Sequence, residues 1–149
     1  MEKLKCYDIF LTHAWRFHDD WRKFSELIDD LPGANWRNFS LPWHDPAMNA
    51  NTDIGGRFIR DFLEAQIIPV HAVVLLSGVH SIVSARRWFD MEVEMALKHN
   101  KPMICIPVYG GNSVPDEVAR LCDASCGWDA MQLFTMIDQV RKLPKYSLV

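Results

Sequence analysis

The sequence predicts a single α/β domain, spanning residues 1–149, with a doubly wound parallel sheet of about five strands and helices on both faces. Two observations carry this prediction. Strand-like and helix-like segments alternate along the whole chain, without repeats, linkers or low-complexity stretches. Residues 70–76 are apolar on both faces, as expected of a central strand that is covered on both sides. The length of 149 residues suits one domain with a sizeable core.

The alternation assigns each element in turn. The predicted strands are residues 7–11, 36–41, 70–76, 103–108 and 124–128, and the predicted helices are residues 19–31, 57–68, 84–99, 113–121 and 130–143. Residues 42–56, rich in Pro, Asn, Asp and Gly, form a long irregular segment. In the flavodoxin-like strand order, ligands bind at the carboxyl ends of the first and third strands. The loop 12–15, Ser77 and the helix 84–99 can converge there.

Composition excludes several classes of function. The net charge of −3 and the pI near 6.0 argue against nucleic acid as a partner. The longest apolar run, residues 72–76, is too short to cross a bilayer, and residues 1–5 do not resemble a signal peptide. The four cysteines form no Cys-x-x-Cys pair and the six histidines show no ligand spacing. We therefore expect a cytoplasmic protein with reduced cysteines, no metal and no membrane partner.

The helix 84–99 carries one carboxylate on an unexpected side. At about 100° per residue, Asp90, Glu94 and Lys98 form a polar stripe, whereas Glu92 falls beside Trp88 on the apolar face. Ser84 is placed to cap the N-terminus of this helix. Burying an unpaired charge costs several kcal/mol, so Glu92 on that face needs an explanation.

Two explanations for Glu92 remain open at this point. In the structural one, the carboxylate accepts a hydrogen bond from a backbone amide or pairs with Arg86 or Arg87. In the functional one, Glu92 lines a cleft beside the sheet and faces a ligand. Its closeness to the carboxyl ends of the first and third strands favours the second explanation.

Common catalytic motifs are missing from the sequence. No Gly-x-Gly-x-x-Gly follows the first strand, and neither a Walker A sequence nor a Gly-x-Ser-x-Gly elbow occurs. The third strand ends at Ser77, where a phosphoacceptor receiver domain would carry a carboxylate. A lone carboxylate among aromatic side chains suits cleavage of a glycosidic bond, because it can stabilise an oxocarbenium-like transition state.

Three blocks of the sequence resemble TIR domains. Residues 7–14 (Tyr-Asp-Ile-Phe-Leu-Thr-His-Ala) are similar to the first TIR strand and its loop. The Trp88-x-x-x-Glu92 pair resembles the TIR helix that bears the catalytic glutamate, and residues 101–108 resemble the strand that follows. The spacing of the blocks and the overall length look most like the stand-alone TIR-like proteins of bacterial Thoeris anti-phage defence.

The resemblance implies an enzyme that cleaves the nicotinamide–ribose bond of NAD+, its substrate, without a permanently bound cofactor. It implies that ADP-ribose is then cyclised into a signal for a separate effector, and that the protein self-associates through TIR surfaces. Glu92 would be the catalytic residue. The residues expected to bind substrate are Thr12, His13, Ala14, Trp15, Trp43, Asp45, Ser77 and Trp88. A non-catalytic TIR interaction module and a nucleoside deoxyribosyltransferase-like enzyme are the alternatives.

Overall fold

A computed structural model describes residues 6–13, 19–40 and 53–141. Its sheet has five strands, all parallel, in the order β2-β1-β3-β4-β5. The strands are β1 (Tyr7–Leu11), β2 (Trp36–Asn38), β3 (Ala72–Leu76), β4 (Met103–Ile106) and β5 (Ala124–Ser125). This order confirms the predicted flavodoxin-like sheet. It also places the reversal of strand order between β1 and β3, at the middle of the sheet.

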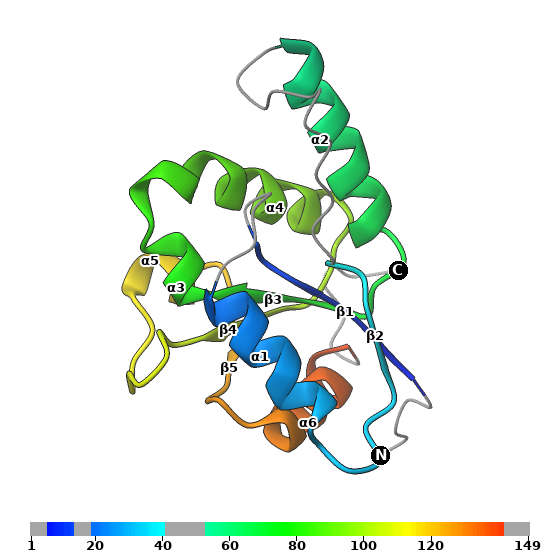
Figure 1. Cartoon of the computed structure of the whole chain (residues 1–149), viewed down its shortest axis with the longest axis vertical. Helices are drawn as coiled ribbons and strands as arrows, with labels where there is room; N and C mark the ends of the chain where they lie inside the picture. Colours follow the sequence, from blue (N-terminus) through cyan, green and yellow to red (C-terminus); the bar gives the residue numbers. More distant parts are fainter. Residues whose placement is uncertain (1–5, 14–18, 41–52, 142–149) are drawn as a thin grey trace, which may run out of the picture.

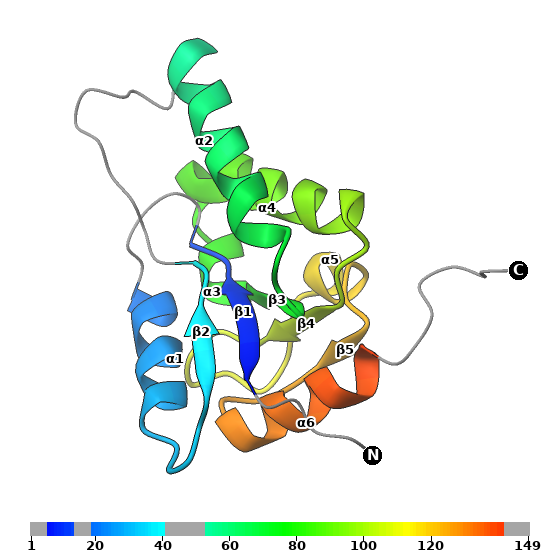
Figure 2. The same ribbon diagram turned by 90° about the vertical axis from the view of Figure 1, so that its right-hand side faces the viewer.

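Helices cover both faces of the sheet, as predicted. The helices are α1 (Asp19–Asp29), α2 (Asp53–Ile67), α3 (Ser77–His80), α4 (Arg86–Lys98), α5 (Asp116–Ala119) and α6 (Ala130–Val140), with a 3₁₀ turn η1 (Val83–Ala85) before α4. Helices α2 and α4 lie together on one face, and α1 and α6 lie on the other (Figures 1 and 2). Among the described residues, no helix has both the length and the apolar character that a membrane crossing requires.

The core lies on both sides of β1 and β3. Every residue of these two strands is buried, and the sequence supplies apolar side chains at nearly all of these positions. Phe24 of α1 and Phe89 of α4 are both fully buried. Burying one such side chain stabilises the fold by about 1.5–3 kcal/mol. The central strands are therefore held by packing from both layers, which fixes the carboxyl end of β1.

Helix α2 begins earlier than predicted. The sequence places its start at Arg57, after the Gly55–Gly56 pair, whereas the structure starts it at Asp53. A glycine costs a helix about 1 kcal/mol relative to alanine. The buried side chains Ile59 and Leu63 anchor the rest of the helix, and this packing outweighs the local preference. The irregular segment is shorter by these four residues, and 41–52 lie outside the described residues.

Two predicted helix caps are wrong. Helix α4 begins after Ala85, with no side-chain capping bond, because the 3₁₀ turn that contains Ser84 leads into it. Helix α5 begins after Pro115, also without a side-chain cap, so Ser113 does not open a capping box. The fixed φ of Pro115 suits the residue that precedes a helix, and it sets the start of α5. Pro115 is therefore a local signal for the start of α5 that competes with Ser113.

Candidate active site at the carboxyl end of β1

Glu92 is fully buried in α4 and points at the end of β1. Its Oε2 accepts a hydrogen bond from the backbone N–H of His13, at 3.1 Å. His13 lies two residues after Leu11, the last residue of β1. The contact joins residues 79 positions apart, at the edge of the sheet where the strand order reverses. The carboxylate thus reaches the place where ligands bind in this fold.

The phase of α4 explains why Glu92 is inside. Trp88, Met91 and Met95 are buried with it, as the predicted apolar face requires. The opposite stripe is exposed, but its charges pair with α2 instead of with each other. Lys98 Nζ lies 2.7 Å from Glu64 Oε2, and Arg60 lies 3.9 Å from Glu94. Glu94 and Lys98 therefore both form ion pairs with α2 at the surface.

The structural explanation for Glu92 is met in one of its two forms. The backbone-amide form is observed, through the N–H of His13. The arginine form is not observed, because Arg86 donates through Nε and Nη2 to the carbonyl of His80 and also lies 3.5 Å from Glu117. Arg87 lies with its guanidinium 4.8 Å from the centre of the Trp88 ring. Both arginines are thus directed to other partners.

His13 brings an imidazole to the same carboxylate. Its ring is buried between Phe10 and Trp21, and its Nε2 lies 3.9 Å from Glu92 Oε2. Burial lowers the pKa of His13 to about 3, because an apolar surrounding disfavours the charged ring. The imidazole is therefore neutral at pH 7. The negative charge of a Glu92 carboxylate is not cancelled by this neighbour.

Thr12 and Ser77 hold the edge of the sheet together. The Thr12 Oγ1 accepts a bond from the N–H of Leu76 at 2.9 Å, which joins β1 to β3. The Ser77 hydroxyl donates to the carbonyl of Ile106 at 2.6 Å, which joins β3 to β4. Both side chains are fully buried. In the structure each hydroxyl bonds to the backbone of a neighbouring strand, and direct substrate contact by either stays a prediction.

The remaining predicted site residues divide into two groups. Trp88 is described, and it is only 6% exposed, with Arg87 over its ring. Ala14, Trp15, Trp43 and Asp45 lie outside the described residues. The assignment of these four residues, and of Trp88, to substrate binding stays a prediction.

Asp20 is a residue of this edge that the sequence did not single out. It lies in the first turn of α1 and is only 8% exposed. Its carboxylate abuts the Cα of Gly78, so that a Cβ at position 78 would overlap Oδ2. Oδ2 also accepts a bond from the N–H of Tyr109, at 3.3 Å. An acidic residue in the first turn of a helix is common because it interacts favourably with the helix dipole. The sequence therefore gave no separate signal for the contacts that Asp20 makes with Gly78 and Tyr109.

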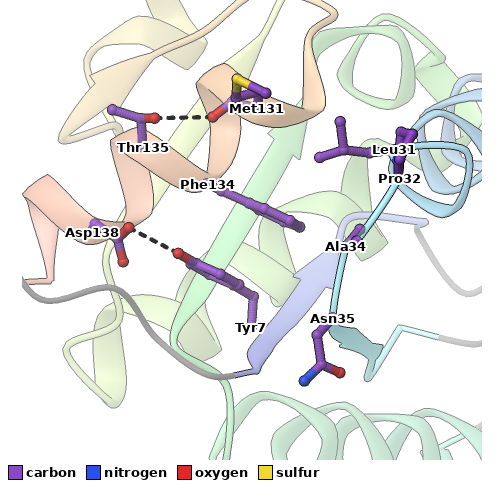
Figure 3. A pocket seen from close by; sticks show the side chains of 10 residues that line it. Tyr7, Leu31, Pro32, Ala34, Asn35, Met131, Phe134, Thr135 and Asp138 are labelled. Atoms are coloured by element: carbon purple, nitrogen blue, oxygen red, sulfur yellow. Dashed lines mark hydrogen bonds between the residues drawn. The ribbon is translucent and has the colours of Figure 1, made fainter.

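A separate cavity lies at the opposite edge of the sheet. It has a volume of about 270 Å³ and is lined by Tyr7, Phe134, Asp138 and the loop after α1 (Figure 3). Tyr7 stacks on Phe134 with ring centres 4.2 Å apart, and its hydroxyl donates to Asp138 Oδ2 at 2.8 Å. Tyr7 is the first residue of β1. The cavity is therefore at the amino end of the strand and does not belong to the Glu92 site.

A metal-dependent site has no support in the described ranges, where no group of three or more His, Cys, Asp or Glu side chains could hold an ion. The four cysteines are free, and burial raises the pKa of Cys126 to about 12, so its thiol is not a nucleophile at pH 7.

Comparison with known protein families and with curated proteins finds no match for the chain.

Proposed function

We propose that the protein is a TIR-like enzyme that cleaves the nicotinamide–ribose bond of NAD+, with Glu92 as the catalytic carboxylate. The observation that carries the proposal is the position of Glu92 at the carboxyl end of β1, with Oε2 on the N–H of His13. That edge is where ligands bind in doubly wound sheets. A buried carboxylate held by a backbone amide is also pre-oriented, which is the condition for electrostatic catalysis.

The proposed reaction asks one task of Glu92. The bond between C1′ of the ribose and the pyridinium nitrogen breaks, and its electron pair leaves with nicotinamide, which becomes neutral. The positive charge moves to the ribose ring as an oxocarbenium ion, which the carboxylate stabilises. A nucleophile of the same ADP-ribose then attacks C1′ and loses a proton, which gives a cyclic product. Attack by water would give linear ADP-ribose instead.

The second candidate is a non-catalytic interaction module. It is favoured by the same hydrogen bond, because a fully buried Glu92 that accepts from His13 also fastens α4 to the end of β1. In this case the carboxylate is structural. The two candidates differ in whether the wild-type protein releases nicotinamide from NAD+.

The decisive experiment is incubation of the purified protein with NAD+, with free nicotinamide as the readout. The proposal expects nicotinamide release by the wild-type protein, loss of release in Glu92→Gln, and normal release in Glu94→Gln. Glu94 is the matched control because it lies on the same helix, is exposed and pairs only loosely with Arg60 at 3.9 Å. No release by the wild-type protein at any concentration would favour the interaction module.

Self-association and a diffusible product complete the proposal. TIR-like enzymes of this kind act as assemblies, so specific activity should rise with protein concentration. Flat specific activity across a hundredfold dilution, with a monomer throughout by light scattering, would contradict self-association. A cytoplasmic setting suits an enzyme that uses NAD+ and carries four free cysteines.

A further inference from the structure

A groove follows the carboxyl ends of β4 and β5, on the same edge of the sheet as Glu92. Pro107 and residues 109–114 form one side of it, and residues 125–128 with Ala119 and Gln132 form the rest of its lining. We refer to it as the β4–β5 groove. It consists of two adjoining hollows of about 410 and 340 Å³, which share Pro107, Asn112 and Gly127. These volumes lie in the range of small-molecule sites.

The side chains that line the groove are mostly polar and uncharged. None of the described residues that line either hollow carries an ionisable acid or base other than Cys126 and Tyr109. The Cys126 thiol is neutral at pH 7, because burial raises its pKa to about 12. Asn112 and Ser113 contribute neutral polar side chains, and Tyr109, which is 58% exposed, contributes an aromatic ring. Lys23 Nζ lies 4.3 Å from the centre of the Tyr109 ring, so one cation stands beside the groove although none is among its lining residues.

The side-chain amide of Gln132, which lines the groove, has a fixed orientation. Its Oε1 accepts from the backbone N–H of Gly127 at 2.9 Å and from the Cys126 thiol at 3.4 Å. A backbone N–H can only donate, so the amide oxygen must be the atom that faces it, and the NH₂ group is turned the other way. Trp128 Nε1 donates to the carbonyl of Pro107 at 2.9 Å, which joins the two sides of the groove.

We propose that the β4–β5 groove binds the adenine end of the dinucleotide, with the Gln132 amide donating to a ring nitrogen of the base and Tyr109 packing against it. This rests on the proposed function, since it places the two ends of one NAD+ molecule on one edge of the sheet. A planar base with nitrogen acceptors matches the neutral side-chain amides of Asn112 and Gln132 and the aromatic ring of Tyr109.

The arrangement of the strands allows both ends to bind at once. Strands β4 and β5 lie two and three strands from β1, or about 10–14 Å at a strand spacing of about 4.8 Å. In NAD+ the two bases are separated by two riboses and a pyrophosphate, so an extended molecule can reach from Glu92 to the groove. The groove would then set affinity, while Glu92 would set the rate of bond cleavage.

The test is titration of adenosine into the full-length protein by calorimetry or NMR. Gln132→Glu is the informative variant, because it keeps an oxygen for the N–H of Gly127 but removes the donor and adds a negative charge. Gln139→Glu is the matched control, since it makes the same change on the exposed side of α6 two turns away. We expect Gln132→Glu to weaken adenosine binding about tenfold or more and Gln139→Glu to leave it unchanged.

Two further measurements keep the groove separate from the catalytic proposal. Tyr109→Ala, which truncates an exposed ring, should weaken adenosine binding about five-fold or more. If NAD+ is cleaved, Gln132→Glu should raise KM about tenfold and change kcat little. Wild-type protein that does not bind adenosine, or Gln132→Glu that binds it as Gln139→Glu does, overturns the groove and leaves Glu92 unaffected. Adenosine binding without NAD+ cleavage supports the groove and overturns the proposed reaction.

Discussion

Replacing Glu92 in two different ways separates its charge from its packing. Glu92→Gln keeps the shape and an oxygen that can accept from the His13 N–H. Exchanging a charge-assisted bond for a neutral one loses about 1 kcal/mol. Removing a buried charge recovers a desolvation cost of several kcal/mol. The free energy of unfolding should therefore stay the same or rise, and the melting temperature with it.

Glu92→Ala should behave differently in stability. It removes this acceptor from the His13 N–H and leaves a cavity in the α4 packing, since Glu92 is fully buried. These losses together amount to about 2–4 kcal/mol. For a chain of this size that is a fall in melting temperature of roughly 5–15 °C. Only the loss of activity, and not the loss of stability, should be common to both variants.

The assay pairs thermal melting with nicotinamide release from NAD+. Glu92→Gln should lose at least about 10²-fold in rate, the scale of one main electrostatic group in an active site. Glu94→Gln, with its exposed side chain, should change stability by no more than about 0.5 kcal/mol and keep its activity. A Glu92→Gln protein that cleaves NAD+ at the wild-type rate would refute the catalytic role. One that melts as low as Glu92→Ala would refute the account of the buried charge.

Three other predictions follow from single contacts. Because the pKa of His13 is lowered to about 3 in the folded protein, the unfolded chain binds a proton more readily below pH 6.5, and the free energy of unfolding should fall by up to about 1.4 kcal/mol per pH unit between pH 6.5 and 3. His13→Phe should reduce this dependence on pH. If the wild-type protein and His13→Phe lose the same stability between pH 7 and pH 5, the buried neutral imidazole is contradicted. Gly78→Ala should destabilise the protein by about 1–3 kcal/mol, because its Cβ displaces the Asp20 carboxylate, and chemical denaturation should show a smaller penalty in an Asp20→Ala background. Arg37 lowers the pKa of Asp8 through two hydrogen bonds of 2.6 and 2.7 Å. Arg37→Met should therefore be less stable than the wild-type protein at pH 7, and this difference in the free energy of unfolding should shrink as the pH falls below 3.8 and Asp8 is protonated. A difference that stays constant in acid would rule out this pair as its source.

The sequence by itself determined the sheet and the orientation of α4. Residues 70–76 predicted a central strand because a strand with apolar residues on both faces must be covered on both sides. The structure places β3 at the centre of the sheet. The helical period placed Glu92 inside and Glu94 outside, and their burial agrees. Both are periodic patterns within one segment, so they need no knowledge of distant residues.

Only the tertiary structure decided what those residues contact. The bond from His13 to Glu92 and the approach of Asp20 to Gly78 join positions far apart in the chain, and no local pattern encodes such distances. The start of α2 was likewise decided by packing and not by the local preference of two glycines. Periodicity assigns a side chain to the interior, but its partner is fixed by which strands and helices the complete fold brings together.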